Sequence, residues 1–415
     1  SGGTVFVGSL STDIEVDHIE TYAAGFAGFM IKTDPNCDPS TWRENFVMTN
    51  ISVHDNYAHS MEDGEGFYIG FTFSDGYTVT CNGQETTVYG HLIENLKVYN
   101  NRTDDTGAEG IQVSSAPDAM VYNNHISRSG QRPFANYQDN GMQIGYSGVH
   151  VFNNLIENGP GTALMMFGTG HKVYNNLIVH PGRMGIFADD RKVGSGHAYM
   201  NNTVIEPGED GIVLYMDEAT TPNLLQNNII VNPGNDSYWR LLNSNVNVTE
   251  SHNILAATVA EVEFNDPNNS DYSLTVNSPA VDQGIDLSAE GVATDSQGAL
   301  RPQGDGFDIG AYEFVPTLRL SGSALSQAIE LTWIIDSSLA NTTTWKIEYQ
   351  SASDSNSTIV DDLPEPTRSY SLSELTNYEA YTITLSAMAQ NTAIYSDTMT
   401  IMPTDIQIYL PTIFD

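Results

Sequence analysis

The sequence repeats a short phrase in which two asparagines follow an aromatic or apolar residue and precede an apolar run. In the five clearest copies the second asparagine of the pair is Asn124, Asn154, Asn176, Asn202 and Asn228. Fainter copies put Asn50, Asn95 and Asn253 in the same slot, and the steps along the whole series are 45, 29, 30, 22, 26, 26 and 25 residues. Repetition at this period predicts a stacked solenoid whose units pack mainly on their neighbours.

Each repeat contains short runs that favour strands rather than helices. An alternating apolar run follows the asparagines, and a third run leads back to the next pair. Between them a second run begins at a glycine, in residues 66–70, 110–114, 141–145, 185–189 and 211–215. Period-two alternation bounded by Gly, Pro and Asn is the strand signal. Three short strands in a coil of this length predict an all-β fold, a right-handed parallel β-helix that rises about 4.8 Å per coil.

The repeated asparagines have a structural explanation in such a coil. Asparagine tolerates the left-handed backbone conformation that a tight turn needs. Its side-chain amide can also donate to, and accept from, the asparagine one coil away, as in stacked Asn ladders. The repeat therefore predicts the fold and not the chemistry of the protein.

The charge of the chain restricts its partners. Fifteen Lys and Arg stand against 52 Asp and Glu, a formal net charge of −37. Phosphate backbones need basic patches, so nucleic acid, anionic membranes and unaided polyanion binding are disfavoured. A strongly acidic surface suits high solubility or cation binding. The sequence contains no run of 18 apolar residues, so no membrane span is predicted.

The two cysteines, Cys37 and Cys81, both fall between a second strand and the following third strand, in neighbouring coils. Stacking would bring these two turns together, which favours a disulfide over two free thiols in separate loops. A disulfide in turn indicates an oxidising compartment, so an extracellular or cell-surface location is expected.

The repeat ends after Asn253, and a different pattern follows in residues 266–284 and 301–314. The phrase Asp-Ile-Gly-Ala-Tyr-Glu at 308–313 is its most specific part. This region resembles the closing segment of secreted bacterial proteins of the pectate-lyase-like β-helix superfamily. The resemblance covers roughly residues 1–314 and implies the β-helix fold, but no particular reaction.

Residues 315–405 predict a second domain, a β-sandwich, from alternating runs at 331–335, 345–350 and 375–389. The last run resembles a fibronectin type III signature in the spacing of Leu375, Tyr381, Leu385 and Ala387. The final stretch, 406–415, is apolar and reads as a strand that needs a partner. The first coil has no amphipathic cap, so either an upstream region was removed or another chain covers it. Both ends thus suggest a homo-oligomer.

The loops between strands one and two differ in length. From the asparagine slot to the next glycine is 9 residues for 176 to 185 and for 202 to 211. The same interval is 16 for 50 to 66, 15 for 95 to 110 and 17 for 124 to 141. Three adjacent coils are therefore expected to carry enlarged loops on one edge, and long loops on a rigid scaffold are where function concentrates.

Polar residues recur at fixed places in these three coils. Those that directly precede the glycine are Glu65, Glu109 and Asn140, and those in the outward middle of strand two are Tyr68, Gln112 and Gln143. In other coils the same outward line is apolar: Met30, Met165, Phe187 and Val213. Stacked carboxylates about 5 Å apart can bind a hard cation or raise one another's pKa and so supply an acid.

These patterns predict a candidate site with three sets of residues. The catalytic set is Glu65, Glu109 and Asp139, with Arg102, Arg132 or Arg128 reaching in from the rim. The substrate-binding set is Tyr68, Gln112, Gln143, Tyr137 and His59. The expected ligands of a calcium ion are Asp63, Asp104 and Asp105.

The resemblance implies two reactions for such a site. Lyases of this fold pair a cation with a Lys or Arg base, and hydrolases use close aspartates on successive coils. Here arginines occur in the loops, but Lys32 is isolated and no basic cluster lies on a strand, which counts against a lyase. A second cluster, with Asp189, Asp190 and His197, reads most simply as a salt-bridged loop.

Two classes of function remain open. The first is a secreted enzyme, lyase or hydrolase, that acts on an extracellular polysaccharide. The second is a non-catalytic extracellular structural or adhesive protein that self-associates, in which the acidic loops are a solvated edge with structural calcium. The localised polar line favours the first class, and the few basic residues and the unusual ends favour the second.

Overall fold

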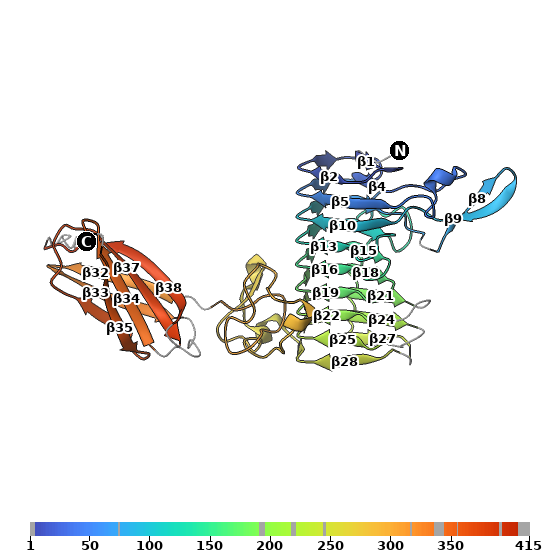
Figure 1. The fold of residues 1–415 in the computed structure, drawn as a ribbon. Helices are drawn as coiled ribbons and strands as arrows, with labels where there is room; N and C mark the ends of the chain where they lie inside the picture. The colour runs from blue at the N-terminus through green and yellow to red at the C-terminus, as the bar shows by residue number, and fades with distance from the viewer. Residues whose placement is uncertain are drawn as a thin grey trace, which may run out of the picture. The chain divides into compact units, whose positions relative to one another are not determined.

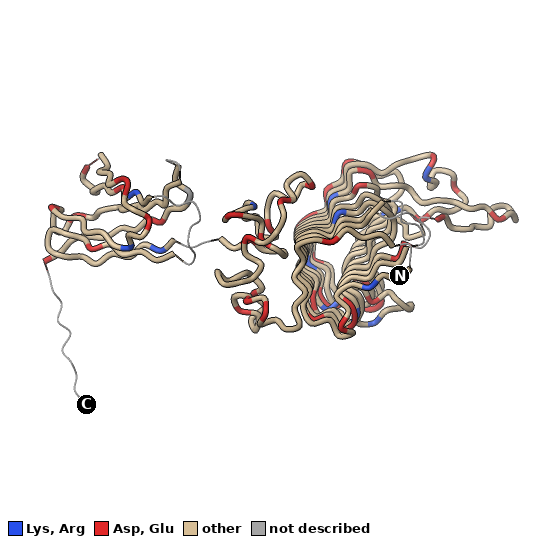
Figure 2. The backbone as a smooth tube through the Cα atoms, turned by 90° about the horizontal axis from the view of Figure 1, so that it is seen from below, with Lys and Arg blue, Asp and Glu red and all other residues tan. Residues whose placement is uncertain are grey.

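A computed structural model of the chain divides it into two compact units, residues 1–314 and 315–415, which are described separately. The structure describes residues 5–73, 75–190, 196–216, 221–243, 246–315, 318–335, 344–354, 356–389 and 392–405. The first unit is a stack of coils in which three long sheets run side by side (Figure 1). Seen along the stack, successive coils superpose as nested outlines (Figure 2).

Each of the three sheets has nine parallel strands, one from each coil. Sheet A contains β1 (Val5–Val7), β4 (Phe29–Ile31), β7 (Phe67–Ile69), β12 (Ile111–Ser114), β15 (Met142–Gly145), β18 (Leu164–Phe167), β21 (Ile186–Asp190), β24 (Ile212–Met216) and β27 (Trp239–Leu241). Sheet B contains β2 (Ile14–Asp17), β5 (Met48–His54), β10 (Ile93–Tyr99), β13 (Met120–Tyr122), β16 (His150–Phe152), β19 (Lys172–Tyr174), β22 (Ala198–Met200), β25 (Asn223–Gln226) and β28 (Val248–Ser251). Sheet C contains β3 (Glu20–Tyr22), β6 (Tyr57–His59), β11 (Arg102–Asp104), β14 (His125–Ser127), β17 (Leu155–Glu157), β20 (Leu177–Val179), β23 (Thr203–Ile205), β26 (Ile229–Val231) and β29 (Ile254–Ala256). The predicted all-β, parallel β-helix fold is confirmed.

The two asparagines of each pair perform different tasks at the turn from sheet B to sheet C. The first, such as Asn123 (φ 54°), takes the left-handed conformation. The second builds a buried ladder: the backbone N–H and the Nδ2 of Asn124 both donate to Oδ1 of Asn154, each at 3.0 Å. Nδ2 of Asn124 also donates to the carbonyl of Val98 in the preceding coil, at 3.0 Å. The ladder therefore satisfies backbone groups that burial at the corner would otherwise leave unpaired.

The register predicted for two of the three fainter copies is wrong, while Asn253 continues the ladder as predicted, since Nδ2 of Asn228 donates to its Oδ1 at 3.0 Å. The ladder continues from Asn124 to Asn101 and Asn56, not to Asn95 and Asn50. Asn50 and Asn95 have positive φ within the seven-residue strands β5 and β10, where Nδ2 of Asn95 donates to Oδ1 of Asn50 at 2.8 Å. They form a second, exposed ladder six residues earlier in the chain, which shares the local sequence pattern of the first.

The interior of the stack is filled by one continuous apolar cluster of inward-facing strand residues. Successive coils place like side chains on one another, as in the stacked rings of Phe29 and Phe67, 4.5 Å apart. Burial of this cluster along the whole stack is the main driving force for the fold, because the apolar area removed from water grows with every coil.

The segment after β29 covers the outer faces of the later coils. Its elements are η2 (Val259–Val262), β30 (Phe264–Asp266), η3 (Pro267–Asn269), β31 (Asp271–Leu274) and η4 (Ser288–Glu290). Phe264, Tyr272 and Leu274 pack on the apolar outer face of sheet C, and Leu287 and Phe307 pack on sheet B. This closing segment, residues 257–314, therefore covers only one part of the β-helix.

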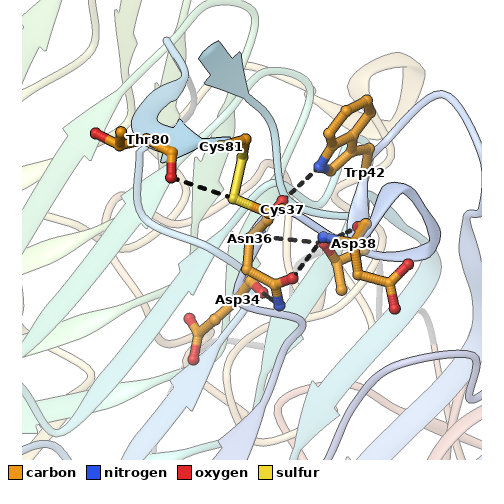
Figure 3. Close-up of a disulfide and its surroundings, with 8 residues drawn as sticks. Asp34, Asn36, Cys37, Asp38, Trp42, Thr80 and Cys81 are labelled. Atoms are coloured by element: carbon orange, nitrogen blue, oxygen red, sulfur yellow. Dashed lines mark hydrogen bonds between the residues drawn. A yellow bond between two sulfur atoms is a disulfide. The ribbon is translucent and has the colours of Figure 1, made fainter. Parts of the chain in front are cut away.

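Two long excursions leave the stack between sheets A and B. The first carries η1 (Pro39–Thr41), and the second carries a hairpin of β8 (Tyr77–Cys81) and β9 (Gln84–Val88) that projects from the stack (Figure 1). The predicted disulfide joins them: Cys37 and Cys81 are bonded, with their Cα atoms 5.4 Å apart (Figure 3). The bond ties the excursions of two adjacent coils to each other.

The second unit consists of two antiparallel sheets. One contains β32 (Leu318–Leu325), β33 (Ala328–Ile335) and β36 (Ser369–Leu372); the other contains β35 (Thr358–Pro364), β34 (Thr344–Ser351), β37 (Tyr381–Ala389) and β38 (Thr392–Ile401). Trp333 and Trp345 are buried in its core, which agrees with a β-sandwich. The more specific fibronectin type III assignment stays a prediction. The apolar strand predicted at 406–415 lies outside the described residues.

Candidate functional site

The outer face of sheet A carries the polar line that the sequence predicts. Strand pairing aligns Gln112 with Tyr68 on one side and with Gln143 on the other. The same line continues through Met30 and Met165 in the flanking coils, so Tyr68, Gln112 and Gln143 form one polar block on β7, β12 and β15; the line becomes polar again at Arg240 of β27. Gln112 and Gln143 are buried, however, so these side chains do not form the open floor that we expected.

Two carboxyl groups lie at the corner where the chain enters sheet A. Glu65 and Glu109 occupy equivalent places in adjacent coils, since the N–H of Gly66 donates to the carbonyl of Glu109 at 3.0 Å. Both side chains are buried, with exposed fractions of 1% and 0%. The Oε2 atom of each accepts no hydrogen bond from the described residues. Two carboxyls buried side by side without compensation are costly if both are ionised.

Burial raises the pKa of both groups. The pKa of Glu65 rises from 4.5 to about 7, and nearby Lys32 opposes part of that rise. The pKa of Glu109 rises from 4.5 to about 8, mainly through burial and next through the charge of Glu65. At neutral pH the pair of carboxyls therefore holds a proton. Two neighbouring carboxyls of which one is protonated and one is ionised can act as an acid and a base in one reaction.

The third residue of this column, Asn140, is also fully buried. Its Nδ2 donates to Oε1 of Glu109 at 3.1 Å and to the carbonyl of Tyr137 at 2.8 Å. Its Oδ1 accepts no hydrogen bond from the part of the chain that the structure describes. Three unpaired acceptor oxygens therefore belong to one column: Glu65 Oε2, Glu109 Oε2 and Asn140 Oδ1.

Only one of the three loops expected to be enlarged is in fact long. Counted from the true ladder residues, the interval is 10 residues from Asn56 to Gly66 and 9 from Asn101 to Gly110, like the ordinary coils. The third interval, from 124 to 141, is 17 residues. The middle part of this segment, residues 128–140, reaches back to the first coil, where the ring centroids of Phe134 and Phe26 are 5.4 Å apart. We call residues 128–140 the corner loop.

The arginines predicted to reach the acids bind elsewhere. Arg128 pairs with Asp104 on sheet C, with Nε 2.9 Å and Nη2 2.5 Å from the carboxylate oxygens. Arg102 lies over the ring of Tyr57, 5.0 Å from its centroid. Neither arginine is placed as predicted, because Arg102 on β11 and Arg128 directly after β14 each interact with a neighbouring residue of sheet C.

Arg132 anchors the corner loop instead of entering the site. It donates to the carbonyls of Met61 and Glu62 and to Oδ1 of Asp105 at 2.9 Å. Asp139 lies near Glu109, whose pKa it helps to raise, but its own carboxylate is paired with Arg183 at 2.5 Å. Arg183 also lies 5.6 Å from the ring centroid of Tyr137, which is 70% exposed. The sequence did not indicate Arg183, because it arrives from a later coil.

Lys32 is not isolated, contrary to the sequence-based expectation. Its Nζ is 2.7 Å from Oδ1 of Asp34 and 4.0 Å from the centroid of the Tyr68 ring. One face of Tyr68 is therefore already occupied, which contradicts its use as an open sugar platform on that side. The Tyr68 hydroxyl meets Oγ1 of Thr72 at 2.6 Å, and Nε2 of Gln112 donates to the same oxygen at 3.0 Å.

The predicted calcium ligands are not brought together. Asp63 is exposed, while Asp104 and Asp105 are each bound to an arginine. His59, predicted to bind substrate, lies on sheet C, where its ring stacks on Tyr57 at 4.4 Å. Among the described residues, the group of metal-type ligands that does converge is Glu15, Asp17 and His54 on sheet B.

The second cluster from the sequence analysis is a buried structural ladder. Nε2 of His197 lies 2.5 Å from Oδ2 of Asp190, and Nδ1 of His197 accepts the backbone N–H of His171 at 3.2 Å. The two imidazoles stack 4.9 Å apart. Burial lowers the pKa of both histidines to about 3, so they stay neutral and serve the backbone. Arg191 and Lys192 lie outside the described residues.

Comparison with known proteins supports the fold. The family model described as a right-handed β-helix region matches residues 133–255. No curated protein sequence shows a significant match. Among solved structures, the enzymatically active domain of tailspike protein 2 from bacteriophage CBA120 is similar at 8% identity and a TM-score of 0.35, with 97% of this chain and 73% of that one covered.

The full-length tailspike protein 2 from an Escherichia coli O157:H7 bacteriophage is similar at 9% identity and a TM-score of 0.25. That match covers 97% of this chain and 65% of the tailspike. Within the described part of the chain, no helix has the length and apolar character needed to cross a membrane.

Proposed function

We propose that this protein is an extracellular hydrolase of a polysaccharide, and that Glu65 and Glu109 carry the reaction. The observation that carries the proposal is the buried pair of carboxyls on adjacent coils, whose pKa values are raised to about 7 and about 8. Glycoside hydrolysis needs one protonated and one ionised carboxyl in close proximity. Neutral pH gives this pair that combination.

The roles of the two acids follow from their environments. Glu109 donates its proton to the glycosidic oxygen as the bond from that oxygen to the anomeric carbon breaks. The carboxylate of Glu65 attacks the anomeric carbon, and water deprotonated by Glu109 then releases the sugar. Adjacent coils are about 4.8 Å apart, a separation that fits retention of configuration. Because both carboxyls are buried, the corner loop must move away for substrate to reach them.

A lyase reaction is less well supported than hydrolysis. Removal of a proton next to a uronate carboxylate needs a free base and a partner for the substrate charge. Lys32 is paired with Asp34, and Arg183 with Asp139. The net charge of −37 also repels a polyanionic chain. The proposed substrate is therefore a neutral polysaccharide.

A second function is favoured by the three unpaired oxygens of Glu65, Glu109 and Asn140. Carboxylate and amide oxygens are the ligands that Ca²⁺ prefers. In this alternative the column holds a structural calcium ion, and the protein is a non-catalytic extracellular scaffold that self-associates through its first coil or through residues 406–415.

One pair of variants separates the two functions. Purified protein, Glu109→Gln and the exposed control Glu94→Gln are assayed on a polysaccharide panel for new reducing ends and for unsaturated products. Hydrolysis predicts reducing ends from the native chain and the control but not from Glu109→Gln. Unsaturated products would contradict hydrolysis. No products at all, together with a melting temperature that rises with Ca²⁺ only when Glu109 is present, would support the scaffold.

A further inference from the structure

The second excursion, residues 70–92, carries an exposed aromatic cluster outside the corner site. Three rings contact one another: Phe71 to Phe73 at 5.5 Å, Phe73 to Tyr77 at 5.6 Å and Phe71 to Tyr77 at 6.1 Å between centroids. Phe71 is buried, but Phe73 is 54% exposed and Tyr77 is 45% exposed. We call Phe73 and Tyr77 the ring pair.

The ring pair is held on a rigid support. Tyr77 begins β8, and Cys81 at the end of the same strand is bonded to Cys37 of the first excursion (Figure 3). The first excursion is itself tied down, since the backbone N–H of Arg43 donates to the carbonyl of Tyr89 at 2.9 Å. A surface that is ordered before binding loses less conformational entropy when a ligand binds.

The surroundings of the ring pair match an uncharged, hydroxyl-rich ligand. Residues 70–92 contain no Lys or Arg, so they offer no partner for an anionic group. The exposed side chains of the hairpin include the hydroxyl and amide groups of Thr78, Thr80, Asn82, Gln84 and Thr87, and the carboxylate of Glu85, which repels an anionic ligand. Aromatic faces beside neutral donors and acceptors are the chemistry that recognises sugar rings.

The ring pair is also connected to the proposed active site. Nζ of Lys32 lies 5.9 Å from the ring centroid of Phe71 and 4.0 Å from that of Tyr68. The strand segment from Glu65 to Gly70 spans roughly 17 Å at about 3.3 Å per residue. A ligand that contacts both the acids and the ring pair must therefore be a chain of several sugars.

We infer that Phe73 and Tyr77 form a distal subsite for a neutral polysaccharide chain, held in place by the Cys37–Cys81 bond. The inference rests on the proposed function for the class of ligand. The inference adds two binding residues to the proposed site. It also predicts that the protein prefers long chains to short ones, a preference that the acids alone would not give.

The test measures binding separately from turnover. Native protein, Phe73→Ala, Tyr77→Ala and the double variant are run in affinity electrophoresis through gels that contain a β-glucan, an α-glucan or a mannan. The control is Tyr378→Ala, which removes a ring of 54% exposure from the second unit. Because both rings are exposed, their removal leaves the fold intact, which circular dichroism checks.

Each single variant is expected to weaken binding of the polysaccharide by about 2- to 10-fold, the worth of one aromatic contact, and the double variant more. The control is expected to bind like the native chain. The double Cys37→Ser, Cys81→Ser variant is expected to bind more weakly, because its hairpin is free to move. Cleavage of short oligosaccharides should be unaffected in the ring variants.

Two results would overturn the inference while leaving the hydrolase proposal intact. One is native-like affinity in the double ring variant while the native chain binds and cleaves a polysaccharide. The other is a change in molar mass of the double variant by light scattering, which would make the ring pair a contact between copies. Failure of the native chain to bind or cleave any polysaccharide would instead overturn the proposed function and, with it, the inference.

Discussion

Two of the groups of acidic side chains that are buried in the first unit differ in whether a cation is buried with them. At the corner of sheet A, Glu65 and Glu109 form no ion pair with any described residue, and each has an oxygen that accepts no hydrogen bond from the described residues. In the closing segment, Glu313 is bound to Arg301, whose Nη1 is 2.7 Å from Oε2. Both members of this ion pair have side chains that are 0% exposed.

The charged residue next to each acid explains why the corner acids and Glu313 differ in chemistry. Burial raises the pKa of both Glu109 and Glu313. For Glu109 the next cause is the charge of Glu65, which raises the pKa further, whereas for Glu313 it is the charge of Arg301, which lowers it. A buried acid next to another acid keeps a transferable proton, and a buried acid next to arginine becomes a structural bond.

The hydrogen bonds of Arg301 show the structural role of the Arg301–Glu313 ion pair. Its guanidinium also donates to the carbonyls of Asp308 at 3.1 Å and Gly310 at 2.8 Å. Nδ2 of Asn201, the left-handed asparagine of a later coil, donates to the same two carbonyls at 2.8 and 3.0 Å. The ion pair thus holds the two carbonyls through which this part of the closing segment binds Asn201, whereas the corner acids are buried without a counter-charge.

The largest loss of stability is expected when the Arg301–Glu313 ion pair is broken. Arg301→Met leaves Glu313 buried without a counter-charge, and such a loss costs about 3 to 5 kcal/mol. Urea unfolding monitored by fluorescence measures it, with the exposed Arg319→Met as control. The double variant Arg301→Met, Glu313→Gln should recover part of the loss. A loss below about 1 kcal/mol in the single variant would show that the pair does not attach the closing segment.

Replacing Glu109 in the corner pair should have the opposite effect on the free energy of unfolding from breaking the Arg301–Glu313 ion pair. The pKa of Glu109 in the folded chain, about 8, lies above its ordinary 4.5, so the folded state binds more protons than the unfolded state between these values. This contribution to stability is complete below about pH 4.5, falls as the pH rises to about 8, and then levels off.

Glu109→Gln keeps the shape of the side chain and removes this titration. The variant should be as stable as the native chain at pH 5 and more stable at pH 8, and the stability difference should change by up to about 1.4 kcal/mol per pH unit between those limits. Urea unfolding at a series of pH values measures the difference. Equal pH dependence in the two proteins would mean that Glu109 is ionised in the folded chain at neutral pH.

A third carboxylate in the corner column would make the stability of the corner depend on a bound cation, in contrast to the Arg301–Glu313 ion pair. Asn140→Asp removes the donor to Glu109 and adds charge, so a loss of about 1 to 3 kcal/mol is expected at pH 7. Calcium at 100 times its dissociation constant should restore about 2.7 kcal/mol. Thermal unfolding with and without Ca²⁺ measures both, with the exposed Asn123→Asp as control. A loss that Ca²⁺ does not restore would count against a cation site in this column.

The smallest effect is expected at the edge of the corner. The side chains of Arg183 and Asp139 are each 23% exposed, and partly solvated ion pairs contribute about 1 kcal/mol or less. Arg183→Met should therefore change the free energy of unfolding little, while it loosens the corner loop and speeds proteolytic cleavage within residues 128–140. Unchanged proteolysis would show that this ion pair does not hold the loop.

Much of the fold could be predicted because it repeats. Glycines at the start of strand two recur with an apolar-x-apolar pattern, and that pattern aligned Tyr68, Gln112 and Gln143 correctly. The position of Cys37 and Cys81 in neighbouring coils was enough to predict their bond. In each case a local pattern is sufficient, because stacking places equivalent residues over one another.

The register of the first coils was predicted wrongly for a local reason. Asn50 and Asn95 stand before apolar runs like those after the true ladder residues, Asn56 and Asn101. Sequence spacing alone does not distinguish a buried ladder from an exposed one six residues earlier. Only the pairing of whole strands decides, because it determines which asparagine side chain faces the interior.

The sequence by itself determined the β-helix, its polar line and the column that contains Glu65 and Glu109. The tertiary structure alone decided that these acids are buried, that Arg102 and Arg128 stay on sheet C, and that Lys32 and Arg183 are the cations near the site. The physical reason is that partners of charged side chains are chosen between coils and loops of irregular length. Those distances follow from how the corner loop and the excursions pack, which no local period encodes.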